Sequence, residues 1–150
     1  MKLCLVCSHG GHFAQMMKLL DAFKSHEFFI VTFQSEGTKH LENAYFVKFE
    51  GWDSRGKLLL VKTILSSIKI LISEKPDIII TTGAGEIAVP FCYVGKSLGI
   101  KIIFIDTLSR ITTSSAAGRL IYPVADLFLV QWESLLKEYG PKAKYWGQVI

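Results

Sequence analysis

The sequence predicts an α/β protein with a doubly wound, Rossmann-like parallel sheet, and two observations support this fold class. Short apolar runs alternate along the chain with longer segments in which apolar residues recur every three or four positions. The runs are continuous rather than alternately polar and apolar, which is typical of parallel strands covered on both faces. The 150 residues suffice for a substantial core, so we expect a single domain over residues 1–150.

The first half of the chain is expected to contain three strands and two helices. Apolar runs at residues 3–7, 28–33 and 44–49 predict the strands. Apolar side chains at helical spacing predict a helix over residues 13–23 and a second one of about four turns over residues 57–72. Residues 34–43 and 50–56 connect these elements.

The second half continues the alternation. Pro76 and Asp77 open an apolar strand at residues 78–81, and Gly99 ends the helix expected at residues 88–98. Further strands are expected at residues 101–105 and 126–130, further helices at 116–122 and 132–139, and a terminal extended segment at 145–150. In such a sheet, ligands bind at the carboxyl ends of the strands.

The turn after the first strand carries the strongest functional signal. Ser8, Gly10 and Gly11 stand between that strand and the first helix, where glycines let backbone N–H groups approach a ligand. The positive end of the helix suits a phosphate or pyrophosphate, although the spacing is neither a dinucleotide fingerprint nor a P-loop. His12 follows in the first helical turn and is our candidate general base; the alternative is that it caps the helix or hydrogen-bonds the pyrophosphate without moving a proton. His9 is expected to play a structural or supporting role.

Two more loops are expected to converge on the same cleft. Gly83 and Gly85 form a second glycine turn after the fourth strand, and Glu86 begins the next helix. Glu86 is either an acceptor contact or a first-turn carboxylate favoured by the helix dipole. Asp106 ends the fifth strand, and Arg110 either binds a phosphate or pairs with Asp106.

Composition narrows the class of ligand and the compartment. The net charge of +4 fits an anionic ligand or an anionic lipid surface better than nucleic acid. An odd count of three cysteines indicates a reducing compartment, and Cys4 and Cys7 would point to opposite faces of a strand. We expect no metal and no cofactor. Only five apolar residues follow Met1 and Lys2 before Ser8, so no secretory signal is expected.

The helix at residues 57–72 is apolar around most of its circumference. Its length of about 24 Å is too short to span a bilayer. Three interpretations remain open: a core helix between layers, an interface with a partner, or a helix lying in a membrane surface with Lys57, Lys62 and Lys69 toward the headgroups. We favour a helix that lies partly in the core and partly against a membrane.

Three segments together form a recognisable series. They are Ser-His-Gly-Gly-His at residues 8–12, Thr-Thr-Gly-Ala-Gly at residues 81–85, and residues 104–132, of which Gln131-Trp132 is the most specific part. On these segments the chain resembles the acceptor-binding, membrane-recruiting subunits of the two-chain UDP-N-acetylglucosamine transferase of the dolichol pathway and their bacterial capsule and exopolysaccharide homologues. It is more distantly similar to the N-terminal domain of MurG-like transferases. Many relatives have Glu-Ser where this chain has Asp106-Thr107.

The resemblance implies that this chain is the acceptor-binding, N-terminal-type half of a GT-B glycosyltransferase. The whole enzyme would be an inverting transferase that uses a UDP-sugar (N-acetylglucosaminyl or galactosyl). The isolated chain would be inactive or nearly so. The acceptor would be a polyprenyl-pyrophosphate-linked sugar, and a separate donor-binding chain would complete a heterodimer. The location implied is cytoplasmic and peripheral, on the inner face of the cell membrane. The rival interpretations are a non-catalytic recruitment scaffold and an independent nucleotide-binding protein.

The partner is expected to dock at the C-terminal end of the domain. Large apolar residues gather there, in a segment that would otherwise fray. The alternative is that this segment only packs against its own domain. The expected interface residues are Trp132, Tyr145, Trp146, Val149 and Ile150.

Overall fold

A seven-stranded sheet, with every strand parallel to its neighbours, forms the centre of the computed structural model, which describes residues 1–48 and 56–150. The strand order is β3-β2-β1-β4-β5-β6-β7. The strands are β1 (Lys2–Val6), β2 (Glu27–Phe33), β3 (Ala44–Val47), β4 (Ile78–Thr81), β5 (Lys101–Ile105), β6 (Leu127–Val130) and β7 (Ala143–Tyr145). This sheet confirms the predicted Rossmann-like fold.

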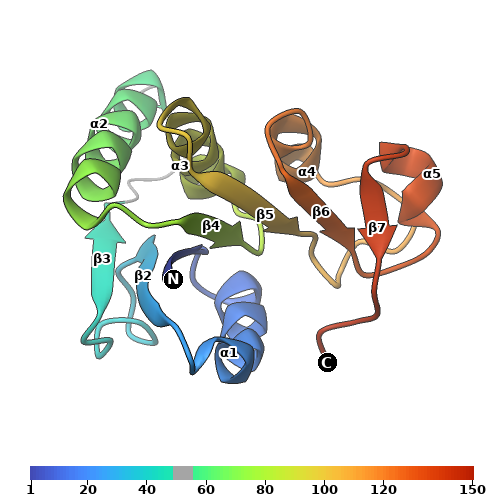
Figure 1. Cartoon of the computed structure of the whole chain (residues 1–150), viewed down its shortest axis with the longest axis horizontal. Helices are drawn as coiled ribbons and strands as arrows, with labels where there is room; N and C mark the ends of the chain where they lie inside the picture. The colour runs from blue at the N-terminus through green and yellow to red at the C-terminus, as the bar shows by residue number, and fades with distance from the viewer. Residues whose placement is uncertain (49–55) are drawn as a thin grey trace.

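Helices cover both faces of the sheet, as Figure 1 shows. The helices are α1 (Gly11–Phe23), α2 (Gly56–Glu74), α3 (Gly85–Ser97), α4 (Ala116–Ile121) and α5 (Leu135–Tyr139). α2, α3 and α4 lie on one face, and α1 lies on the other face together with the end of the C-terminal segment. Two separate apolar clusters fill the two faces.

The side chains of β1 alternate between these two clusters. Cys4 packs on the face covered by α2 and α3, whereas Leu5 and Cys7 pack on the α1 face. This confirms that Cys4 and Cys7 point in opposite directions. All three cysteines are free and buried, and burial raises the pKa of the Cys7 thiol to about 12.

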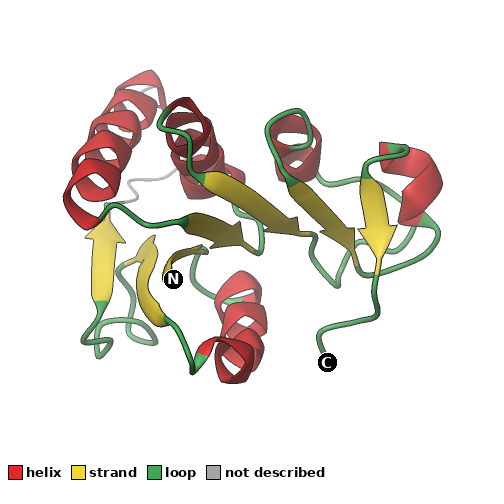
Figure 2. Cartoon of the chain, viewed as in Figure 1, coloured by secondary structure: helices red, strands yellow, loops and turns green. Residues whose placement is uncertain are grey.

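The structure corrects several expected boundaries; Figure 2 shows the observed helices, strands and loops. The helix expected at 57–72 extends over Gly56–Glu74, and the one expected at 88–98 begins earlier, at Gly85. The helix expected at 132–139 is shorter and begins only at Leu135. The end of the strand expected at 44–49, and the connection at 50–55, lie outside the described residues.

Strand β7 is the element that the sequence analysis missed. Its central residue Lys144 is exposed while Ala143 is buried, so the strand has no continuous apolar run. An edge strand with one face in solvent gives only a weak signal over three residues. Tyr145, the first residue of the segment expected to be extended at 145–150, is therefore the last residue of β7.

Helix α2 buries two hydroxyl side chains and exposes much of its apolar surface. Thr63 and Ser67 are buried and donate hydrogen bonds to the backbone carbonyls of Leu59 and Ile64, so these hydroxyl groups are satisfied within the helix. The exposed large apolar residues of the helix are Leu58, Leu60, Val61, Leu65, Ile68 and Ile72. No helix in the described part of the chain is long and apolar enough to cross a membrane.

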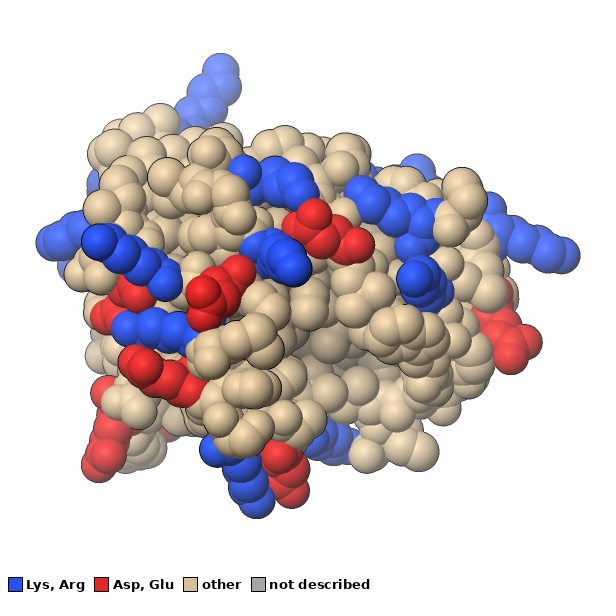
Figure 3. All heavy atoms as spheres, viewed as in Figure 1, with Lys and Arg blue, Asp and Glu red and all other residues tan. Residues whose placement is uncertain are grey.

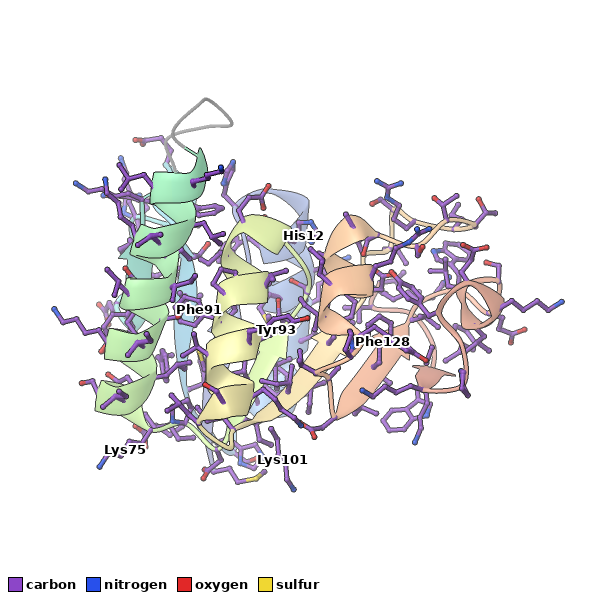
Figure 4. The ribbon with its side chains drawn as sticks, turned by 90° about the horizontal axis from the view of Figure 1, so that it is seen from above. His12, Lys75, Phe91, Tyr93, Lys101 and Phe128 are labelled. Carbon is purple, nitrogen blue, oxygen red and sulfur yellow. The ribbon has the colours of Figure 1, made fainter. Side chains whose placement is uncertain are left out.

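The strand order places the carboxyl ends of β1 and β4 side by side at the point where the order reverses. This is where open α/β sheets bind ligands. In Figure 4, His12 lies at the edge of the molecule where α3 and α4 begin, whereas Lys75 and Lys101 lie at the opposite edge. The loops that follow β1, β4 and β5 therefore bound the candidate site.

Candidate functional site

A pair of hydrogen bonds joins the loop after β1 to the loop after β4. His12 Nδ1 lies 2.7 Å from the carbonyl oxygen of Thr82, and the Thr82 hydroxyl donates to the His12 carbonyl oxygen at 2.9 Å. A carbonyl oxygen only accepts, so Nδ1 carries the proton in this bond. In the neutral imidazole, Nε2 is then the nitrogen with the free lone pair, which is the form that a general base requires.

The two glycine turns are shaped for this contact. Gly10 adopts a φ of +79° before α1, and Gly83 adopts a φ of +105° after β4. A Cβ atom on Gly83 would lie 3.0 Å from His12 Cε1, so any other residue there would push the imidazole aside. Gly11 differs, because a Cβ there would meet nothing within 4 Å and the space over the turn is open.

Both helices that begin at these turns lack a side-chain cap. α1 follows Gly10 and α3 follows Ala84, and neither cap residue has a side chain that could accept a hydrogen bond from the backbone N–H groups of the first turn. The first N–H groups of a helix have no partner inside the helix. Ala84 has a φ of +74°, an uncommon value for a residue other than glycine, and such strain is typical of functional sites.

A cleft of about 520 Å³ lies beside α1, with His12 in its wall. It is bounded by α1, by the segment after β5 and by the C-terminal segment. Its lining residues are Gly11, His12, Ala14, Gln15, Lys18, Thr107, Leu108, Ser109 and Val149. In Figure 3 a hollow is visible between α1 and the C-terminal segment, and most of its visible wall is neither basic nor acidic.

Asp106, expected to face a ligand, is engaged inside the protein. It is 1% exposed, and its carboxylate accepts hydrogen bonds from the Tyr139 hydroxyl at 2.6 Å and the Ser115 hydroxyl at 2.9 Å. Burial and the contact with Asp106 raise the pKa of Tyr139, which therefore stays a donor. The carboxylate thus ties β5 to α4 and α5, and no ion pair with Arg110 forms.

The backbone of Asp106 organises a second network under the cleft. Its carbonyl oxygen accepts from Gln15 Nε2 at 3.1 Å and from Gln131 Nε2 at 2.7 Å. Gln131 Oε1 in turn accepts from the backbone N–H of Val149 at 2.7 Å. One buried carbonyl group therefore connects α1, the end of β5 and the C-terminal segment.

The remaining predicted contacts are Ser8, Gly85, Glu86 and Arg110. Gly85 and Glu86 occupy the first turn of α3, and Ser8 donates to the neighbouring His9 carbonyl. Arg110 is exposed and donates to the Thr113 hydroxyl. None of these four residues lines the cleft beside α1. His9 packs edge-on against Phe33, also outside that cleft.

The expected interface residues divide into inward and outward groups. Trp132 packs on the core and its indole N–H donates to the Leu108 carbonyl, and Tyr145 also packs on the core. Val149 lines the cleft. Trp146 and Ile150 point outward, at 69% and 83% exposure.

Sequence reasoning missed the side chains of α1 and of residues 107–109 that line the cleft. Gln15 and Lys18 follow Gly11 at intervals of four and three residues, which places all three on one helix face. That spacing is visible in the sequence and would have identified them. Among residues 1–48 and 56–150, no group of three or more His, Cys, Asp or Glu side chains is placed to hold a metal ion.

Comparison with known proteins finds a matching family and several relatives of this chain. Residues 54–149, more than half of the chain, match the family described as "Oligosaccharide biosynthesis protein Alg14 like". The chain is 24% identical to the UDP-N-acetylglucosamine transferase subunit ALG14 of Rattus norvegicus, over 99% of this chain and 82% of that protein. It is 35% identical to the subunit of the same name from Candida albicans, over 60% of this chain and 43% of that protein.

Solved structures share the fold at low sequence identity. A UDP-GlcNAc 2-epimerase from Methanocaldococcus jannaschii, in complex with UDP-GlcNAc and UDP, matches 99% of this chain with a TM-score of 0.76 and 14% identity. The lipopolysaccharide outer core galactosyltransferase WaaB matches 96% with a TM-score of 0.68 and 14% identity. The chain spans 47% and 44% of these proteins, which confirms the predicted fold of one half of a GT-B-like enzyme.

Proposed function

This chain belongs to the family of Alg14-like oligosaccharide biosynthesis proteins, and from that membership we propose that it is the acceptor-binding subunit of a UDP-sugar glycosyltransferase. The acceptor is a sugar linked to a polyprenyl diphosphate. A separate chain binds the UDP-sugar donor and completes the enzyme as a heterodimer. Two curated relatives are named as transferase subunits, which supports a division of the enzyme between chains.

The observation that carries the proposal is the hydrogen bond between His12 Nδ1 and the Thr82 carbonyl. It leaves Nε2 available at the wall of a cleft at the carboxyl edge of the sheet. His12 Nε2 takes the proton from the acceptor hydroxyl while that oxygen forms a bond to the anomeric carbon of the donor. The bond from that carbon to UDP breaks, and UDP leaves with the electron pair.

The glycine turn gives the acceptor its first anchoring point. Gly10 and Gly11 present the uncapped start of α1, whose backbone N–H groups and partial positive charge suit one phosphate of the diphosphate. The Thr82 carbonyl, which accepts from Nδ1, also stabilises the imidazolium ion that forms during the transfer. Glu86, Gly85, Ser8 and Arg110 border the acceptor at the outer margin.

The subunit also brings its partner to the inner face of the cell membrane. The exposed apolar stripe on α2 and the neighbouring lysines support peripheral contact with an anionic lipid surface. A pure recruitment scaffold is the second candidate function. The same apolar stripe favours it, and it would need no proton transfer by His12.

The experiment that separates the two functions uses the complex of this chain with its candidate donor-binding partner. Transfer from several UDP-sugars is measured for the wild type, His12→Ala and His40→Ala, the last being an exposed histidine away from the cleft. We expect His12→Ala to lower turnover by roughly 10²–10⁴, as for loss of a general base, while complex formation persists. Near-full turnover of His12→Ala would favour the scaffold instead.

A further inference from the structure

The cleft beside α1 contains a charged side chain that the proposed mechanism does not use. Lys18 shares one face of α1 with Gly11 and Gln15, and it is the sole lysine, arginine, aspartate or glutamate among the described lining residues. No described carboxylate forms an ion pair with Lys18. Other lysines do have carboxylate partners, namely Lys2, Lys24, Lys39 and Lys96.

A diphosphate needs more positive charge than the glycine turn supplies. The end of a helix is equivalent to about half an elementary charge, whereas a diphosphate ester carries at least two negative charges near neutral pH. Lys18 lies seven residues beyond Gly11, or about 10 Å along the helix axis. Side chains on a helix lean toward its N-terminus, so an extended Lys18 reaches back toward the first turn.

The floor of the cleft gives an independent indication of a bound molecule. Gln15 is 7% exposed, and its amide orientation is fixed because Nε2 donates to the Asp106 carbonyl. Its Oε1 atom forms no hydrogen bond with the described residues. Because Gln15 also lines the cleft, a ligand with hydroxyl groups could donate to this oxygen.

We propose that Lys18 binds the second phosphate of the acceptor's diphosphate and makes the cleft select diphosphates over monophosphates. This inference rests on the proposed function. The first phosphate lies on the Gly10–Gly11 turn, and the hydroxyl groups of Thr107 and Ser109 on the opposite wall donate to the same anion. A sugar hydroxyl donates to Gln15 Oε1. The ligand class is thus a glycosyl diphosphate, and Lys18 supplies the charge that distinguishes it from a glycosyl phosphate.

The test uses the full chain alone, with inorganic pyrophosphate and inorganic phosphate as probes in titration calorimetry at fixed ionic strength. We expect Lys18→Ala to weaken pyrophosphate binding about tenfold or more, as for loss of a charge-assisted hydrogen bond, with phosphate binding changed less than about threefold. Lys18→Arg keeps the charge and should retain pyrophosphate binding. Lys24→Ala is the matched control, because Lys24 directly follows α1 and pairs with Asp21.

Four results would overturn the inference. Two concern the wild type: phosphate bound as tightly as pyrophosphate, or no measurable binding of pyrophosphate. The other two concern the variants: unchanged pyrophosphate affinity in Lys18→Ala, or an equal loss of pyrophosphate affinity in Lys18→Ala and Lys24→Ala. Circular dichroism and thermal melting establish that each variant is folded. Since the titration needs neither donor nor partner, its failure is distinct from a failure of sugar transfer in the complex.

Discussion

At the residue scale, the proposed base depends on a neighbour that has no side chain. The Thr82 carbonyl fixes which ring nitrogen of His12 carries the proton, and Gly83 provides the space in which the ring lies. The sequence marked Gly83 as a phosphate contact, a role that remains a proposal. The geometry gives it a second role that spacing alone could not reveal, because the two residues come from different loops.

Gly83→Ala is expected to reduce turnover as well as stability. A Cβ 3.0 Å from His12 Cε1 pushes the imidazole away, and a misplacement of this kind costs about tenfold to a hundredfold in rate. The matched control is Gly99→Ala, which has a φ of +79° but no atom within 4 Å of the new Cβ. Both variants should lose roughly 1–2 kcal/mol in denaturant unfolding, because alanine is strained at positive φ.

Only Gly83→Ala should lower turnover of the complex per folded molecule. Equal turnover of the two alanine variants would show that the close approach of Gly83 to His12 has no consequence for transfer.

At the element scale, the structure shows which face of α2 packs in the core and which face stays exposed. Its buried residues are Thr63, Ser67, Ile70 and Leu71, and they pack toward the domain. Positions 58, 61, 65, 68 and 72 form a continuous exposed apolar stripe at intervals of three and four residues. The helix is thus partly in the core, and its outer stripe remains for a membrane or a partner. Its Lys57, Lys62 and Lys69 are all exposed, and the only carboxylate on the helix is Glu74 at its end.

We expect the Val61→Ser/Leu65→Ser double variant to bind vesicles of phosphatidylglycerol and phosphatidylcholine roughly tenfold more weakly than the wild type. The two side chains are 52% and 61% exposed, and loss of their burial in lipid removes the apolar contribution. Sedimentation with the vesicles measures the effect, and high salt should weaken binding further, because the lysines attract anionic lipid.

The control for this element is the Ile111→Ser/Leu120→Ser double variant, whose two positions are 50% and 53% exposed and lie away from α2. If both double variants lost the same affinity for vesicles, the membrane contact would not be specific to α2. Binding that resists both salt and carbonate washing would indicate a stronger anchor than this stripe provides.

At the scale of the whole molecule, the sequence determined the architecture better than the site. Continuous apolar runs such as Ile78–Thr81 are strong signals, because a strand buried on both faces has no polar positions. Topology alone also predicted that the loops after β1 and β4 meet, as the hydrogen bonds between His12 and Thr82 confirm. The inward direction of the Asp106 carboxylate could not be predicted in this way. Its partners Ser115 and Tyr139 lie 9 and 33 residues further along the chain and reach it only in the folded domain. A carboxylate at a strand end has the same local sequence whether it faces solvent or a buried hydroxyl.

The C-terminal segment illustrates the same limit, and its two possible roles can be separated. Val149 is held by Gln131 and lines the cleft, as expected if the segment packs on its own domain. Trp146 lies after β7, is 69% exposed and has the Lys144 amine over its ring, as expected of an interface anchor. The segment therefore forms one wall of the cleft with its inner side, and we propose its exposed outer side as the docking surface for the partner.

Two point variants are expected to divide these roles. Trp146→Ala should weaken association with the donor-binding chain by about tenfold or more in co-purification and titration, with unchanged thermal melting, because an exposed ring contributes little to the fold. Val149→Ser should raise the KM for the acceptor while leaving association intact.

Deletion of residues 146–150 should leave β7 and the fold in place but abolish both association and transfer. If the shortened chain still formed the active complex, the docking surface would lie elsewhere on the domain. The exposed apolar stripe of α2 would then be the next surface to test.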